Sequence, residues 1–143
     1  MVADIHVVFD CADPDRLARF WMAALEGYDF PGGPPDGFDT WEAWADANDI
    51  PEDQRNSGRT LVDQVANRPD IFFLRVPEPK VVKNRVHLDV KVGRGDADAD
   101  SRERIEAKVA ELLALGASIA EDFARDGALV VMRDLEGNEF CVS

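Results

Sequence analysis

The chain has 143 residues, a formal net charge of −13 and two cysteines. This length suits one domain with a sizeable core, and the negative charge excludes general binding to nucleic acid or to an anionic membrane, because phosphate would be repelled over most of the surface. The two cysteines, Cys11 and Cys141, cannot form the disulfide framework of a small secreted domain. No signal-peptide pattern follows Met1 and no apolar run reaches membrane-spanning length, so we expect a cytoplasmic protein without membrane or nucleic-acid partners.

The first predicted elements are a strand over residues 5–11 and the helix that follows it. Apolar and less apolar positions alternate along the strand, which is typical of a strand with one face on a core. Its more apolar face consists of Ile5, Val7, Phe9 and Cys11, and His6 lies on the other face. Asp13 and Pro14 predict the helix start, because an Asp cap accepts free backbone N–H groups and proline suits the first helical position. Gly27 is expected to end the helix.

A long excursion over residues 31–68 follows a short strand that begins at Tyr28. Its start is rich in proline and glycine, which breaks regular structure. A short helix is expected over 39–48, with Trp41 and Trp44 on one side. Long connections in compact domains are often lids or binding loops. The two tryptophans would therefore either line a ligand site or pack this excursion against the rest of the protein.

Two strands are predicted next, over residues 71–76 and 86–92, with Pro77 closing the first. The second strand alternates strictly. Its core face would hold Val86, Leu88, Val90 and Val92, and its other face His87, Asp89 and Lys91. A histidine in the middle of a polar strand face offers a metal ligand or a proton carrier.

The last part of the chain predicts one helix and three strands. The helix runs from Asp100 to a glycine stop at Gly116, with an apolar stripe of Ile105, Val109, Leu112 and Leu113. The strands cover residues 117–123, 128–133 and 139–142. Tight turns at Asp126-Gly127 and Glu136-Gly137-Asn138 connect them.

The order of elements contains a repeat. A strand, a helix with a glycine stop and further strands occur twice, first near His6 and again near His87. We therefore expect an α+β fold in which two βαβββ modules form one curved mixed sheet around a cleft, with the helices on the outer face. A ferredoxin-like βαββαβ fold is the alternative. The chain, 1–143, would be one domain, with a first module of about 1–82 that includes the excursion and a second of about 83–143.

Four stretches of this sequence resemble the glyoxalase-like proteins of the vicinal oxygen chelate superfamily, also called the glyoxalase/bleomycin resistance/dioxygenase superfamily. The stretches are 10–14 with 17–21, 75–80, 83–89 and 134–142, and they follow the expected order over almost the whole chain. The resemblance implies paired βαβββ modules whose cleft chelates a divalent metal or binds a small molecule without one. It also implies a homodimer as one form of assembly.

The resemblance implies metal ligands at His6 and His87, which would suit zinc, nickel, manganese or iron. The usual carboxylate of the final strand falls at Cys141, with Glu139 two residues earlier on the same strand face. The corresponding strand of the first module offers Arg75 and no acid. A thiolate could bind a soft metal. The lost carboxylate fits equally a site that holds no metal, in which Cys141 is a small, partly buried apolar residue.

Two functions follow from these residues. In the first, a metal-free protein binds a small molecule in a cleft with the excursion as its lid. The expected contacts are Trp41, Trp44, Phe73, Arg75 and Lys91. Arg75 could receive a carboxylate or phosphate of the ligand, because its planar fork accepts such groups well.

The second function is a metal-dependent lyase or isomerase. Its metal would stabilise an enolate-like intermediate by polarising a substrate oxygen, and Glu139 or Asp89 would move the proton. The missing carboxylate favours the binding protein, whereas the His6 and His87 pair favours the enzyme.

Overall fold

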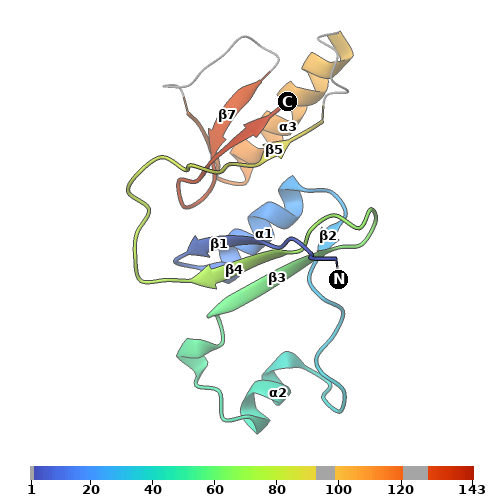
Figure 1. Ribbon diagram of the computed structural model, residues 1–143, viewed down its shortest axis with the longest axis vertical. Coiled ribbons are helices and arrows are strands. Elements are labelled where there is room, and N and C mark those ends of the chain that lie inside the picture. The colour runs from blue at the N-terminus through green and yellow to red at the C-terminus, as the bar shows by residue number, and fades with distance from the viewer. Residues whose placement is uncertain (1, 93–98, 121–128) are drawn as a thin grey trace. The chain divides into compact units, whose positions relative to one another are not determined.

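The computed structural model describes residues 2–92, 99–120 and 129–143 (Figure 1). The chain divides into two compact units, Met1–Pro77 and Glu78–Ser143. Each unit has its own four-stranded sheet. Within the described ranges, no helix combines the length and the apolar character needed to cross a membrane.

The first unit has a βαβββ topology with an additional helix. Its elements are β1 (Val7–Cys11), α1 (Pro14–Ala24), β2 (Tyr28–Asp29), α2 (Trp41–Ala47), the short 3-10 helix η1 (Glu52–Gln54), β3 (Gly58–Asp63) and β4 (Ile71–Arg75). The strand order is β1-β4-β3-β2. β1 runs parallel to β4, and the other pairs are antiparallel. Figure 1 shows α2 on the long connection between β2 and β3.

Helix α1 forms as predicted and covers the core of this unit. The Asp13 side chain accepts a hydrogen bond of 3.2 Å from the backbone N–H of Arg16, and Pro14 occupies the first turn. Its buried stripe consists of Leu17, Ala18, Phe20, Trp21 and Ala24. The Trp21 ring lies 5.1 Å from Phe9, which in turn stacks on Phe73 at 5.3 Å. The face of β1 and β4 that carries these two phenylalanines is therefore the one that α1 covers.

The second unit repeats this topology. Its elements are β5 (Asp89–Val90), α3 (Ala99–Ala114), β6 (Ser118–Ile119), β7 (Val130–Arg133) and β8 (Glu139–Val142). The strand order is β5-β8-β7-β6, with β5 parallel to β8 and the other pairs antiparallel. The predicted α+β fold with βαβββ modules is confirmed, and the ferredoxin-like alternative is wrong, because α1 and α3 are each followed by three strands of their own sheet.

The strand predicted over 86–92 is much shorter than expected. β5 has two residues, and Val86, predicted to face the core, is 83% exposed. β8, its parallel partner, begins only at Glu139, so among the described residues no strand pairs with residues 83–86. Val90 is buried and Leu88 and Val92 are half-buried, so the alternation holds only where β8 provides a partner.

The remaining predictions for the second unit hold in part. Ile105, Val109 and Leu112 are buried along α3, but Leu113 is 42% exposed and lies outside the buried stripe. The turn into β8 forms around the Asp134 carboxylate, which accepts the backbone N–H groups of Glu136 and Asn138 at 2.9 and 3.0 Å. The turn predicted at Asp126-Gly127 lies outside the described residues.

Candidate functional sites

The first unit contains a pocket of about 530 Å³ between α2 and the outer edge of β3, named here the α2 pocket. β2 pairs only with Val62 and Asp63 of β3. The first half of β3 therefore has no strand on its outer side among the described residues, and the pocket lies there. Its aromatic lining is Phe30, Trp41, Trp44 and Phe72, and its charged lining is Asp15, Arg19, Glu42, Arg55 and Arg59.

Helix α2 presents the two tryptophans to the pocket. The Thr40 hydroxyl caps the helix by accepting the Ala43 N–H at 3.0 Å. Trp41 and Trp44 are three residues apart and so lie on one side of the helix. Their ring centroids are 5.7 Å apart and their planes are inclined by 82°. Trp41 is 49% exposed, so this aromatic surface is accessible to a ligand.

The part of the pocket wall that Phe72 forms depends on a glycine, Gly58. A Cβ atom at Gly58 would lie 2.7 Å from Cζ of Phe72, closer than real Cβ atoms come to a neighbour. The Phe72 ring can lie against this backbone because Gly58 has no side chain. The ring is half-buried and lines the pocket.

The charged rim of the pocket is organised by Asp15. Its two carboxylate oxygens accept hydrogen bonds from Arg19 Nε at 2.8 Å and from Arg59 Nε at 3.1 Å. The Arg19 hydrogen bond is the main reason that the pKa of Asp15 lies below its usual value, and Arg59 adds to it against the opposing effect of burial. Arg59 Nη1 also donates to the carbonyls of Arg55 and Gly58, at 2.8 Å each. The two guanidinium groups are thus held in place by hydrogen bonds within the protein.

The structure brings only some of the predicted ligand contacts to this pocket. Trp41 and Trp44 line it, as proposed from the sequence. Phe73 has no exposed surface and lies in the core against Phe9. Arg75 is exposed and is not among the lining residues. Sequence reasoning missed Phe72, which alternates with Phe73, and the Asp15–Arg19 pair, whose i,i+4 spacing on a predicted helix was visible.

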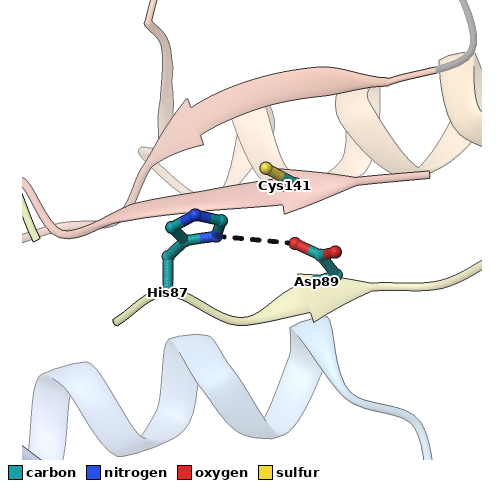
Figure 2. A group of neighbouring side chains, drawn as sticks. All are labelled: His87, Asp89 and Cys141. Atoms are coloured by element: carbon teal, nitrogen blue, oxygen red, sulfur yellow. Dashed lines mark ion pairs between the residues drawn. The ribbon is translucent and has the colours of Figure 1, made fainter. Parts of the chain in front are cut away.

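The second unit gathers three possible metal ligands, named here the His87 cluster: His87, Asp89 and Cys141. One donor atom from each lies within 4.8 Å of the others. Asp89 and Cys141 are register partners on parallel strands β5 and β8, and His87 precedes Asp89 by two residues. Figure 2 shows the His87 and Asp89 side chains turned toward each other, with Nδ1 and Oδ1 3.6 Å apart, and the Cys141 sulfur beside them. A cavity of about 270 Å³ adjoins the cluster.

The donor chemistry of this cluster fits a thiophilic divalent ion. Imidazole, carboxylate and thiolate together are typical zinc ligands, whereas manganese prefers oxygen donors. Cys141 is 6% exposed and packs with Ala120 and Val131. This packing equally suits the apolar role proposed for it from the sequence.

Glu139 lines the same cavity, but its carboxylate is fully engaged. Lys80 Nζ lies 3.0 Å from Oε2, and the backbone N–H of Asn84 donates to Oε2 at 2.9 Å. Burial by itself would raise the pKa of Glu139, but the bonds from Asn84 and Lys80 outweigh it and lower the pKa to about 2. Such a weakly basic carboxylate is poorly suited to accept a proton at neutral pH. Sequence reasoning missed both partners.

Two further predicted residues, His6 and Lys91, belong to neither pocket lining. His6 is an exposed residue of the first unit, in the stretch before β1. Lys91 is an exposed residue of the second unit, directly after β5. Neither is among the residues that line the two pockets.

Solved structures with the same fold include several glyoxalase-like proteins. A glyoxalase/bleomycin resistance protein/dioxygenase family enzyme from Burkholderia phytofirmans matches with a TM-score of 0.61 and 16% identity, over 98% of this chain and 97% of that one. A mutant of the fosfomycin resistance protein FosX from Listeria monocytogenes, complexed with Mn(II) and 1S,2S-dihydroxypropylphosphonic acid, matches with a TM-score of 0.61 and 10% identity, over 99% and 90% of the chains. At these identities the likeness shows the fold alone.

Family membership rests on the sequence itself. No curated protein matches the chain. The model of the glyoxalase-like domain family, in contrast, matches residues 6–143, which include both units from β1 to the end of β8. The expected resemblance is confirmed, and the chain belongs to the glyoxalase-like domain family.

Proposed function

We propose that this protein binds a small molecule in the α2 pocket. The observation that supports the proposal is the combination of size and lining. A volume of about 530 Å³ lies within the range of roughly 300–1,000 Å³ that is usual for ligand sites. Ligand sites are also mostly apolar and aromatic, with a few placed polar groups, and here Trp41, Trp44 and Phe72 meet a rim of paired side chains.

The polar side chains of the pocket are held by hydrogen bonds within the protein. Asp15 fixes Arg19 and Arg59, and Arg55 fixes the end of α2 by hydrogen bonds to the Ile50 carbonyl and the Asp46 carboxylate. A preformed site loses less side-chain entropy on binding and so retains more of its contact energy as affinity.

Tryptophan fluorescence tests this proposal. The chain has three tryptophans, and Trp21 is fully buried in the core, so a ligand in the pocket would act on Trp41 and Trp44. A library of metabolites and drugs should contain compounds that quench or shift the emission, with or without a chelator. The same compounds should have a much weaker effect on Trp44→Ala, which lacks one of the two pocket tryptophans. If no compound changes the emission of the wild-type protein, the proposal is wrong.

A metal-dependent lyase or isomerase is the second candidate, and the His87 cluster is the observation that favours it. His87, Asp89 and Cys141 would hold the ion, and His6 stays a proposed ligand on the resemblance alone. A bound divalent ion polarises a substrate oxygen. With Asp89 in the ligand set and Glu139 tied to Lys80 and Asn84, neither carboxylate is well placed to move a proton.

Metal content separates the two candidates. Untagged protein would be soaked with zinc, nickel, manganese or iron(II), desalted and analysed by mass spectrometry. If the protein is a metal-dependent enzyme, the wild type should retain about one equivalent of zinc. Both His87→Ala and Cys141→Ser should lose this zinc. Full retention of metal by both variants would rule the cluster out as its site.

Assembly and location also remain proposals. A homodimer is implied by the family resemblance and is measurable by sedimentation velocity. The cytoplasmic location proposed from the sequence is measurable by cell fractionation. A monomer at all concentrations, or recovery from a membrane or secreted fraction, would contradict these proposals.

A further inference from the structure

We infer that the α2 pocket takes a planar aromatic molecule that bears an oxyanion group, with Arg59 as the residue that receives the anion. This inference rests on the proposed function, because it names the ligand class of the same pocket. It depends on two separate features of the lining, one aromatic and one charged.

The aromatic feature selects a flat ring. Trp41 and Trp44 pack edge to face with each other, with their planes inclined by 82°, and both line the pocket. Aromatic partners prefer offset-stacked and edge-to-face contacts, and a flat ligand can make both here. Phe72, held against Gly58, lines the same pocket as a further ring.

The charged feature selects an anion. Three arginines and two acids line the pocket, and one of those acids, Asp15, is shared between Arg19 and Arg59. The bonds of Arg59 to Asp15, Arg55 and Gly58 use Nε and Nη1. Its Nη2 group has no hydrogen-bond partner within the described part of the chain, and the side chain is 30% exposed. A guanidinium edge of this kind binds an oxyanion well.

A cationic ligand fits this lining less well. Aromatic faces do attract cations, but the Arg19 guanidinium already lies 5.2 Å from the centroid of the Phe30 ring. An added cation would also meet the charges of Arg55 and Arg59 in the same pocket. The arginines therefore favour an anionic group over a cationic one.

Two fluorescent probes with the same ring skeleton test the inference. 8-Anilinonaphthalene-1-sulfonate carries a sulfonate, and N-phenyl-1-naphthylamine lacks it. We expect the wild-type protein to bind the sulfonate probe about tenfold more tightly than the neutral one, as a charge-assisted contact predicts. Arg59→Gln should weaken the sulfonate probe by about tenfold and leave the neutral probe unchanged. Arg16→Gln is the matched control, because Arg16 is exposed on α1 and does not line the pocket.

A second variant keeps the test decisive if Arg59→Gln proves unstable. Arg19 is 60% exposed, so Arg19→Gln should fold. In this variant Asp15 pairs with Arg59 only and neutralises more of its charge. The sulfonate probe should therefore bind several-fold more weakly. Equal affinity of the two probes, with no effect of either arginine variant, overturns the ligand class and leaves the pocket intact. Binding of both probes that survives Trp41→Ala and Trp44→Ala instead contradicts the proposed function itself.

Discussion

The backbone N–H of Asn84 donates a hydrogen bond of 2.9 Å to the Glu139 carboxylate, although 55 residues separate them in the sequence. Together with Lys80, this bond ties the irregular segment before β5 to the first residue of β8. The Glu139 side chain thus holds a stretch of backbone that is not paired with β8 by strand hydrogen bonds. The ionised Glu139 carboxylate therefore helps to hold this segment against β8.

Acid should therefore destabilise the protein through Glu139. Its pKa is about 2 when folded against an ordinary value of 4.5. A lowered folded pKa gives stability that is complete above pH 4.5 and is lost as the pH falls toward 2. The shift corresponds to about 3 kcal/mol of unfolding free energy. Urea denaturation at pH 7, 4.5 and 3 measures it.

Glu139→Gln is the comparison that isolates this residue. Asp63, which accepts hydrogen bonds from Arg68, also has a lowered pKa and contributes acid sensitivity of the same sign. Its contribution is the same in both proteins. Wild type should lose more stability than Glu139→Gln between pH 4.5 and 3, and parallel curves would show that the anchoring role is wrong.

Gly58→Ala should damage both the fold and the pocket. The added methyl group would lie 2.7 Å from the Phe72 ring, and overpacking of this kind costs about 1–3 kcal/mol. The displaced ring should also weaken ligand binding. Gly32→Ala is the matched control, because nothing lies within 4 Å of its added methyl group. Thermal melts and probe titrations compare the stability and the probe affinity of the two variants. Equal stability and equal affinity would show that the contact between Gly58 and Phe72 does not shape the pocket.

Thr40→Ala should weaken ligand binding with little change in overall stability. Thr40 caps α2, a helix of seven residues with one buried side chain, Ala45. Loss of such a cap costs about 1 kcal/mol, which corresponds to roughly fivefold in affinity if α2 must form to bind. Thr40→Ser keeps the hydroxyl and should bind like the wild type. A Thr40→Ala protein with unchanged affinity would show that α2 is no part of the site.

Chelation should leave ligand binding unchanged. The α2 pocket contains none of the residues of the His87 cluster, so excess chelator and the variant His87→Ala should both preserve the affinity of the sulfonate probe. The probe is titrated with and without chelator. An affinity that falls in both cases would favour the metal-dependent alternative.

Much of the fold could be predicted from local signals. Asp13 and Pro14 mark the start of α1 because capping is a short-range interaction, and the repeated order of strand, helix and strands indicates two similar modules. β5 could not be predicted in length, because the number of paired residues depends on where its distant partner β8 begins. The alternation of apolar and polar residues over 86–92 carries no information on that limit.

The candidate sites were predictable only in part. Trp41 and Trp44 stood out as aromatic residues in a long connection, and His87 and Cys141 stood out by resemblance. Alternation separates Phe72 from Phe73 but does not say which faces the core, because the two are the same residue type. The Lys80 and Asn84 partners of Glu139 lie in an irregular segment without periodicity, so only the folded structure shows them.

The most direct test of the α2 pocket is a calorimetric titration of 8-anilinonaphthalene-1-sulfonate into wild type, Trp41→Ala and Val81→Ala. Trp41 is half-exposed and Val81 is an exposed residue of the second unit, so neither change should unfold the protein. We predict about tenfold weaker binding for Trp41→Ala, as the loss of an aromatic contact in a ligand site implies, and unchanged binding for Val81→Ala. Equal affinities for all three proteins would contradict the central claim.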